Sequence, residues 1–104
     1  MSVETNTAGD ITVLKVEGDL SEANGVELRA AASAALGAGQ RDFVVDLSDA
    51  PLCDSTGLEA LTWLQRECDE QLALVKLCGM TDTFRKILEI TGLNHRFADE
   101  FENF

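Results

Sequence analysis

Short apolar runs alternate along this chain with longer segments in which apolar residues recur at helical spacing. The runs ITVLKVE at 11–17, FVVDL at 43–47 and LALVKL at 72–77 each predict a strand, and a shorter strand is expected near Val3. The continuous apolar run at 43–47 is typical of a strand that is buried on both faces of a sheet. RFA at 96–98 indicates a last edge strand.

The segments between these runs predict three helices. Residues 22–36 are rich in alanine and are followed by Gly37 and Gly39, which suit a helix end. Residues 56–70 place Leu58, Leu61, Leu64 and Cys68 on one face, and residues 84–91 close at Gly92. Strands that alternate with helices favour an α/β fold. We therefore expect residues 1–104 to form a single domain with a four- to five-stranded, mostly parallel mixed sheet and about three main helices.

The charge balance narrows the choice of partners. The chain has 19 acidic and 8 basic residues, a formal net charge of −11. Nucleic acids and anionic lipid surfaces repel such a chain, whereas a basic protein surface attracts it. The N-terminal segment lacks the features of a signal peptide, and no apolar stretch approaches the roughly 18 residues that a membrane span needs. These features predict a cytoplasmic protein with no membrane insertion and no direct nucleic-acid partner.

The cysteines and the histidine do not suggest a metal site. Cys53, Cys68 and Cys78 form no CxxC pair, and the single histidine, His95, lies far from them in sequence. A zinc site needs a denser cluster of ligands, and the odd count does not indicate a disulfide framework. Cys68 and Cys78 are expected to be small core residues. We predict no metal and no cofactor.

The richest loop for chemistry is SDAPLCDSTG at 48–57, between a predicted strand and the next helix. Thr56 and Glu59 have the spacing of a capping box, and Ser55 or Asp54 could also cap the helix. Gly57 costs about 1 kcal/mol of helix propensity relative to alanine, which is unexpected for a simple cap. Local chemistry alone nevertheless favours capping over function for these hydroxyls.

Other kinds of chemistry find little support in the sequence. A serine nucleophile needs a base, GxSxG is absent, and no glycine-rich phosphate loop occurs. Asp46, Asp49 and Asp54 could surround a magnesium ion, as at a receiver-type acceptor aspartate. The first strand, which ends in KVEGD at 15–19, lacks the tight acidic pair of such a site, and the chain is short for that architecture. We expect Asp46 and Asp54 to accept hydrogen bonds from loop amides. The sequence predicts that the protein is not an enzyme.

The sequence resembles STAS domains, specifically the bacterial anti-sigma factor antagonists. The strongest match is FVVDLSDAPLCDSTGLEAL at 43–61, in which DSTGL opens a helix after a buried strand. VEGDL at 16–20 and LALVKLCGMTDTFRKILEITGL at 72–93 are weaker matches. The resemblance covers nearly the whole chain and implies the STAS fold. Cys53 replaces a larger apolar residue and is expected to be a small buried filler rather than a redox sensor.

The resemblance also implies a mechanism. Ser55 would be phosphorylated by an anti-sigma factor that is an ATP-dependent serine kinase, with Thr56 as a minor alternative acceptor. Asp54 would orient the site, and Gly57 and Leu58 would shape the docking surface. The unmodified protein would bind the kinase and so release a sigma factor, and a serine/threonine phosphatase would reverse the modification.

Two further expectations concern the partner surface. Ser21 stands where many family members carry an acid after the early strand, so the first loop departs from the family's usual kinase-docking surface. No lysine or arginine lies between Arg41 and Arg66, so phosphate is expected to act by repulsion or a clash, unless Arg85 or Lys86 lies near it in the fold. The alternative function is an unmodified STAS subunit of a larger complex, such as the cytoplasmic ATPase of an ABC lipid transporter.

Overall fold

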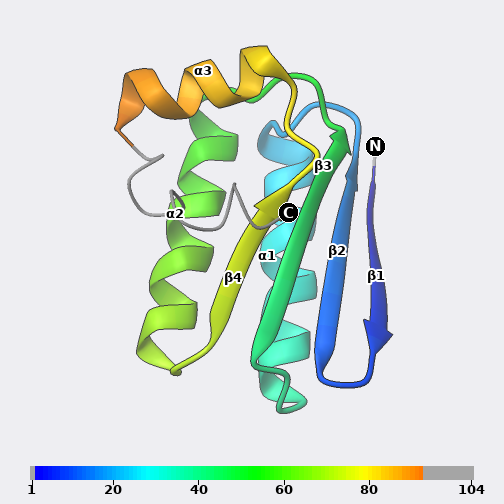
Figure 1. The fold of residues 1–104 in the computed structure, drawn as a ribbon. Coiled ribbons are helices and arrows are strands. Elements are labelled where there is room, and N and C mark those ends of the chain that lie inside the picture. Colours follow the sequence, from blue (N-terminus) through cyan, green and yellow to red (C-terminus); the bar gives the residue numbers. More distant parts are fainter. Residues whose placement is uncertain (1, 93–104) are drawn as a thin grey trace.

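The computed structural model describes residues 2–92, which form a mixed sheet with helices packed against it (Figure 1). The strands of this part of the chain are β1 (Ser2–Ala8), β2 (Ile11–Glu17), β3 (Asp42–Asp49) and β4 (Leu74–Cys78). The helices are α1 (Glu22–Gly37), α2 (Ser55–Glu70) and α3 (Asp82–Thr91). The edge strand predicted at 96–98 lies outside the described residues.

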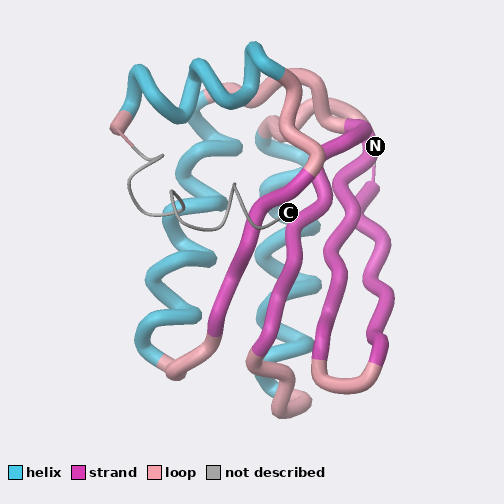
Figure 2. The backbone as a smooth tube through the Cα atoms, viewed as in Figure 1, coloured by secondary structure: helices cyan, strands magenta, loops and turns pink. Residues whose placement is uncertain are grey.

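The order of strands in the sheet is β1-β2-β3-β4. β1 pairs with β2 as an antiparallel hairpin, whereas β2 with β3 and β3 with β4 are parallel. The parallel pairs are joined by α1 and α2, which run back along the sheet (Figure 2). The predicted α/β fold, with a mostly parallel mixed sheet and three helices, is confirmed.

The helices cover one face of the sheet. On β3 the side chains of Phe43, Val45 and Leu47 are buried, while Val44 and Asp46 between them are only half-buried. This alternation means that the described part of the chain covers one face and leaves the other open. The expectation that 43–47 would be buried on both faces is therefore wrong. Its continuous apolar run comes from Val44, which lies on the open face.

One predicted boundary shifts and another is confirmed. β4 begins at Leu74 rather than at residue 72, because Leu72 has a φ of 57° and its side chain is 90% exposed. The left-handed backbone at Leu72 completes the turn after α2, and the amide of Ala73 then donates to the carbonyl oxygen of Cys68 at 2.7 Å. The predicted end of the third helix is confirmed, since Gly92 has a φ of 78° and caps α3.

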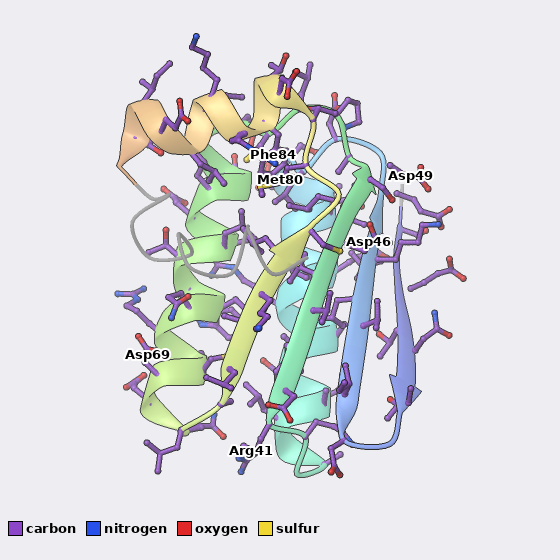
Figure 3. The ribbon with its side chains drawn as sticks, in the orientation of Figure 1. Arg41, Asp46, Asp49, Asp69, Met80 and Phe84 are labelled. Carbon is purple, nitrogen blue, oxygen red and sulfur yellow. The ribbon has the colours of Figure 1, made fainter. Side chains whose placement is uncertain are left out.

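The parallel strands give the sheet a carboxyl end and an amino end. α3 lies at the carboxyl end of the parallel strands and runs over the start of α2, and Figure 3 places Asp49 and Phe84 at this end. Arg41 and Asp69 mark the opposite, amino end of these strands (Figure 3). In α/β sheets functional groups gather at the carboxyl end, where strands end and helices begin.

Candidate functional site

Three loops meet at the carboxyl end of the sheet and are joined to one another by hydrogen bonds. The amide of Gly18 donates to the carbonyl oxygen of Asp49 at 3.0 Å, and the amide of Leu20 donates to that of Leu52 at 2.9 Å. The hydroxyl of Thr81 donates to the carbonyl oxygen of Pro51 at 2.8 Å. We call residues 18–21, 49–55 and 79–82 the three-loop end. These bonds fix the DSTG segment on both sides.

The loop after β2 is held from inside the domain by Asn24. This side chain is fully buried, and its amide nitrogen donates to the carbonyl oxygens of Glu17 at 3.1 Å and Asp19 at 2.8 Å. The same loop forms an isolated parallel bridge between Leu20 and Cys53. Asn24 therefore positions the strand-like segment against which the DSTG loop lies.

Asn24 was not among the residues predicted from the sequence, although its spacing could have revealed it. Asn24 lies four residues before Leu28, and the buried positions of α1 continue at Ala32 and Leu36. A polar residue that occupies the buried stripe of a helix needs hydrogen-bond partners inside the protein. Loop carbonyl groups at the start of the same helix are the nearest such partners.

Asp54 is the N-cap of α2. Its Oδ1 accepts a hydrogen bond from the amide of Gly57 at 2.9 Å, and its extended backbone is bonded through its own amide to the carbonyl oxygen of Leu20 at 3.2 Å. The capping box predicted for Thr56 and Glu59 is therefore wrong, because the helix begins at Ser55 and its cap position is taken. The prediction that Asp54 accepts from a loop amide is confirmed.

Asp46 shows the same behaviour on β3. Its Oδ1 accepts a hydrogen bond from the amide of Ser48 at 3.0 Å, as predicted. Residues 2–92 contain no group of three or more histidine, cysteine, aspartate or glutamate residues that could hold a metal ion. The carboxylates of Asp46 and Asp54 thus accept hydrogen bonds from backbone amides, and Asp49 is exposed on the surface.

Gly57 is required by the close approach of the neighbouring loop. A Cβ atom at this position would lie 1.9 Å from the carbonyl oxygen of Leu20 and 2.7 Å from its carbonyl carbon. No real Cβ makes such a contact, so either the helix or the loop would have to move. Gly57 is buried, and its missing side chain serves this internal packing rather than an outer surface.

Ser55 is the first residue of α2 and is exposed. Its hydroxyl makes no hydrogen bond to any of residues 2–92. The first turn of α2 carries no acidic residue. Unpaired amides and the helix dipole at such a terminus stabilise a negative group. A phosphoryl group could therefore be attached to the Ser55 hydroxyl oxygen without disturbing the fold.

Thr56 differs from Ser55 in its surroundings. It is half-buried and lines a small hollow of about 150 Å³ together with Glu22, Gly25, Val26 and Arg29 of α1. Arg29 is the basic residue that the fold places near the start of α2, whereas the sequence suggested Arg85 or Lys86. The guanidinium carbon of Arg29 lies 5.7 Å from the centre of the Trp63 ring, at cation–π distance.

The remaining predicted partner residues lie on either side of the DSTG loop. Ser21 is the N-cap residue of α1, half-buried, and its hydroxyl makes no cap hydrogen bond. Leu58 is half-buried on the outer face of α2. It lines an open groove of about 480 Å³ with Arg29, Glu59, Thr62, Arg66 and Thr91. The structure thus brings Ser21, Asp54 and Ser55 to one end of the molecule, with Leu58 one turn further along α2.

Electrostatics at the three-loop end are dominated by acids. Asp19, Asp49, Asp54 and Asp82 are exposed there. Lys15 of β2 forms an ion pair with Asp49, with 3.2 Å between Nζ and Oδ2, and this hydrogen bond and charge raise the pKa of Lys15. Burial, followed by the charge of Asp54, raises the pKa of the Cys53 thiol to about 12. Cys53 is therefore a protonated filler at neutral pH, as predicted.

Among the described residues, no helix is both long and apolar enough to cross a membrane.

The comparisons with known proteins agree with this arrangement. A family model described as "Mlab, STAS domain" matches residues 3–99. The anti-sigma-B factor antagonist of Staphylococcus aureus is 28% identical over 93 residues, which cover 89% of this chain and 86% of that protein. The chain belongs to the STAS domain family.

Solved structures show the same fold at lower identity. The phosphorylated form of the Bacillus cell fate determinant SpoIIAA has a TM-score of 0.73 at 19% identity, over 92% of this chain and 88% of that one. A sulfate transporter family protein from Wolinella succinogenes has a TM-score of 0.77 at 18% identity, over 86% of this chain and 73% of that one. The STAS fold predicted from DSTGL and its flanking segments is confirmed.

Proposed function

We propose that this protein is an anti-sigma factor antagonist whose binding to a partner is controlled by phosphorylation of Ser55. The observation that carries the proposal is the exposed, unbonded Ser55 hydroxyl at the start of α2, held in place by the capped and bridged loop before it. The name of the Staphylococcus aureus relative supports the same class of function.

In this proposal the unmodified protein binds an anti-sigma factor that is a serine kinase, and so frees a sigma factor. The kinase transfers the γ-phosphoryl group of ATP to Ser55. The bond between Oγ and phosphorus forms as the bond to the bridging oxygen of ADP breaks, and the hydroxyl proton passes to a base of the kinase. The protein itself is a substrate and a ligand in this cycle, not an enzyme.

Phosphorylation would change the surface rather than the fold. A phosphate adds about −1.5 to −2 charge at neutral pH, and the start of a helix accommodates it. The acids Asp19, Asp54 and Asp82 already surround the site, so the added charge acts on the partner. Release of the kinase follows, and a serine/threonine phosphatase restores the binding form.

The test is to incubate the purified protein with the kinase-type anti-sigma factor of its source organism and ATP, and to locate the phosphate by mass spectrometry. We expect one phosphate on Ser55 in the wild type, none in Ser55→Ala, and normal labelling in Thr56→Val. Label on Thr56 alone would move the acceptor by one residue. Absence of label from both hydroxyls would refute the proposal.

A second candidate function is that of an unmodified STAS subunit in a transport complex, such as the cytoplasmic ATPase of an ABC lipid transporter. The observation that favours a role in transport, as opposed to transcription control, is the fold shared with the Wolinella succinogenes sulfate transporter family protein. In that case the three-loop end would pack against an ATPase and Ser55 would remain unmodified. Stable co-purification with an ABC ATPase, together with unlabelled Ser55, would support this second function.

A further inference from the structure

Leu52 is an exposed apolar residue in a loop that is otherwise fixed. Its side chain is 47% exposed, although it lies three residues before Ser55 in a segment tied to two neighbouring loops. Its carbonyl oxygen accepts from Leu20, the carbonyl of Pro51 before it accepts from Thr81, and Cys53 after it is buried. The backbone around Leu52 is therefore already held in one conformation.

A fixed backbone makes an exposed leucine a suitable anchor for a partner. Binding through a mobile loop requires the loop to be ordered, which weakens the complex. Here the neighbouring loops have already ordered the backbone, so only the side chain of Leu52 needs to be immobilised. Residues at the centre of an interface that fill apolar pockets contribute most of its binding energy.

The charges around Leu52 define the chemistry of the partner. Asp19 adjoins the Leu20 amide that binds the Leu52 carbonyl, and Asp82 follows the Thr81 that binds Pro51. Both carboxylates are exposed. The residues of the three-loop end include no lysine or arginine, and the ammonium group of Lys15, from β2, pairs with Asp49 rather than with Asp19 or Asp82. An apolar residue with an acidic surround fits an apolar pocket that has lysine or arginine on its rim.

We propose that Leu52 is the apolar anchor of the surface that binds the kinase-type anti-sigma factor, and that Asp19 and Asp82 pair with basic residues around the receiving pocket. This inference rests on the proposed function for the identity of the partner. Three extended residues span at most about 11 Å, so a kinase that holds Leu52 has Ser55 within that distance.

This division of roles explains how an acidic surface can bind a basic partner and still release it on phosphorylation. The acids around Leu52 face the basic rim and favour association. Ser55 faces the nucleotide of the kinase, because its hydroxyl must meet the γ-phosphate. A phosphate on Ser55 then repels the phosphates of the bound nucleotide and occupies their space.

The first experiment compares Leu52→Ser with Leu74→Ser, a matched loss of an apolar side chain that is 60% exposed at the amino end of β4. Titration calorimetry measures binding of each unphosphorylated variant to the kinase with a non-hydrolysable ATP analogue. We expect the Kd to rise at least ~10-fold for Leu52→Ser, as for a central anchor, and less than ~2-fold for Leu74→Ser. Thermal midpoints confirm that both variants fold. Equal affinities for the two variants would overturn the anchor.

The second experiment tests the charges by kinetics. We expect Asp19→Asn with Asp82→Asn to lower the association rate constant about 3- to 10-fold at low salt, with the difference vanishing near 1 M salt. Asp10→Asn with Glu70→Gln removes two exposed acids at the opposite end and serves as the control. Equal effects of the two double variants would show that only net charge matters and would refute the basic rim.

A photo-crosslinking amino acid at position 52 identifies the contact directly. We expect crosslinks to a kinase peptide that contains apolar residues next to lysine or arginine, and none from the same amino acid at position 74. This readout separates the two proposals. Crosslinking and Leu52-dependent binding without label on Ser55 would leave the anchor intact and refute the phosphorylation switch. Label on Ser55 with no crosslink at position 52 would do the reverse.

Discussion

The two ends of the sheet are built in different ways. At the amino end each connection is short and closes mainly on itself. The turn between β1 and β2 contains Gly9 with a φ of 62°, and α1 is followed by Gly39 with a φ of 95°. Each of these glycines has open space where a side chain would stand. These two glycines allow the chain to change direction, and among residues 2–92 they pack against no other loop.

At the carboxyl end the connections hold one another. Gly57 fits against the backbone of Leu20, and a Cβ added at Gly79 would lie 2.8 Å from the amide of Ser48. Asn24 ties the first loop to α1, and Thr81 ties the third loop to the second. The difference teaches that close backbone packing and hydrogen bonds between loops hold the carboxyl end in one conformation. A surface that presented Ser55 in one geometry would require such an end.

The largest expected difference between the ends concerns their glycines. Gly57→Ala forces a Cβ into the carbonyl group of Leu20, and we expect it to lower the free energy of unfolding by about 3 kcal/mol, the upper range for overpacking. Gly37→Ala is the control, because Gly37 lies at the end of α1 with no atom near its missing side chain. Alanine there should raise stability by up to about 1 kcal/mol.

Urea unfolding followed by circular dichroism measures both glycine variants. The decisive quantity is the midpoint of each transition, provided that the slope stays unchanged. If Gly57→Ala were as stable as the wild type, the close packing of α2 against Leu20 would not be a feature of the folded protein.

The sequence was sufficient to predict the elements and their order, because each strand and helix has a strong pattern of its own. The alanine-rich segment at 22–36 and the amphipathic segment at 56–70 differ from the observed helices by about one residue at either end. The outer face of the sheet was not predictable from 43–47, since Val44 is apolar whether or not another layer covers it. Periodicity reports side-chain types, whereas coverage depends on the path of the chain.

The site was predictable only in part, for a related reason. The DSTGL segment led to the prediction that Ser55 is the phosphorylation site, which stays a prediction, but it did not say which of the polar residues caps α2. That choice depends on the bond between the Asp54 amide and Leu20, which lies 34 positions earlier in the chain. Arg29 was missed because it belongs to α1 and lies beside Thr56 only through the packing of α1 against α2. Contacts of this kind have no local pattern in the sequence.

The next prediction compares two buried polar side chains, one at each end. Asn24→Ala leaves two loop carbonyl oxygens without their donor, and we expect a loss of about 2 kcal/mol in the free energy of unfolding. Thr12 is also fully buried, and its hydroxyl donates to Gln40 at 3.0 Å at the amino end. Thr12→Val keeps the shape of the side chain and should cost about 1 kcal/mol or less.

A second readout tells whether Asn24 holds the loop or only adds stability. After correction for the change in global stability, hydrogen exchange of the backbone amides of Leu20 and Asp54 should be faster in Asn24→Ala than in the wild type. In Thr12→Val the corrected exchange should stay unchanged. Uniform acceleration across the domain in both variants would contradict a local role for Asn24.

The smallest expected effect concerns the thiols, which report how tightly the three-loop end is closed. Cys53 is buried between two loops and its pKa is about 12. Cys78 is only half-buried at the end of β4, so the expectation that it is a core residue is wrong, although burial also raises its pKa. Only thiolates react readily with iodoacetamide. At pH 8 we therefore expect Cys53 to be alkylated at least ~10-fold more slowly than Cys78 in the folded protein. Peptide mapping by mass spectrometry measures both rates in one sample.

The same pKa gives the thiol a defined effect on stability. The ordinary thiol pKa is 9.0, so as the pH rises the unfolded chain loses this proton before the folded protein does. The contribution of Cys53 is therefore complete below about pH 9 and declines as the pH approaches 12. Cys53→Ala should remove this part of the decline in alkaline urea titrations.

In Asn24→Ala, faster alkylation of Cys53 with unchanged protection of Cys68, buried near the end of α2, would place the opening at the carboxyl end alone. Equal acceleration at both thiols would instead mean that Asn24 stabilises the whole domain and that the two ends do not open independently.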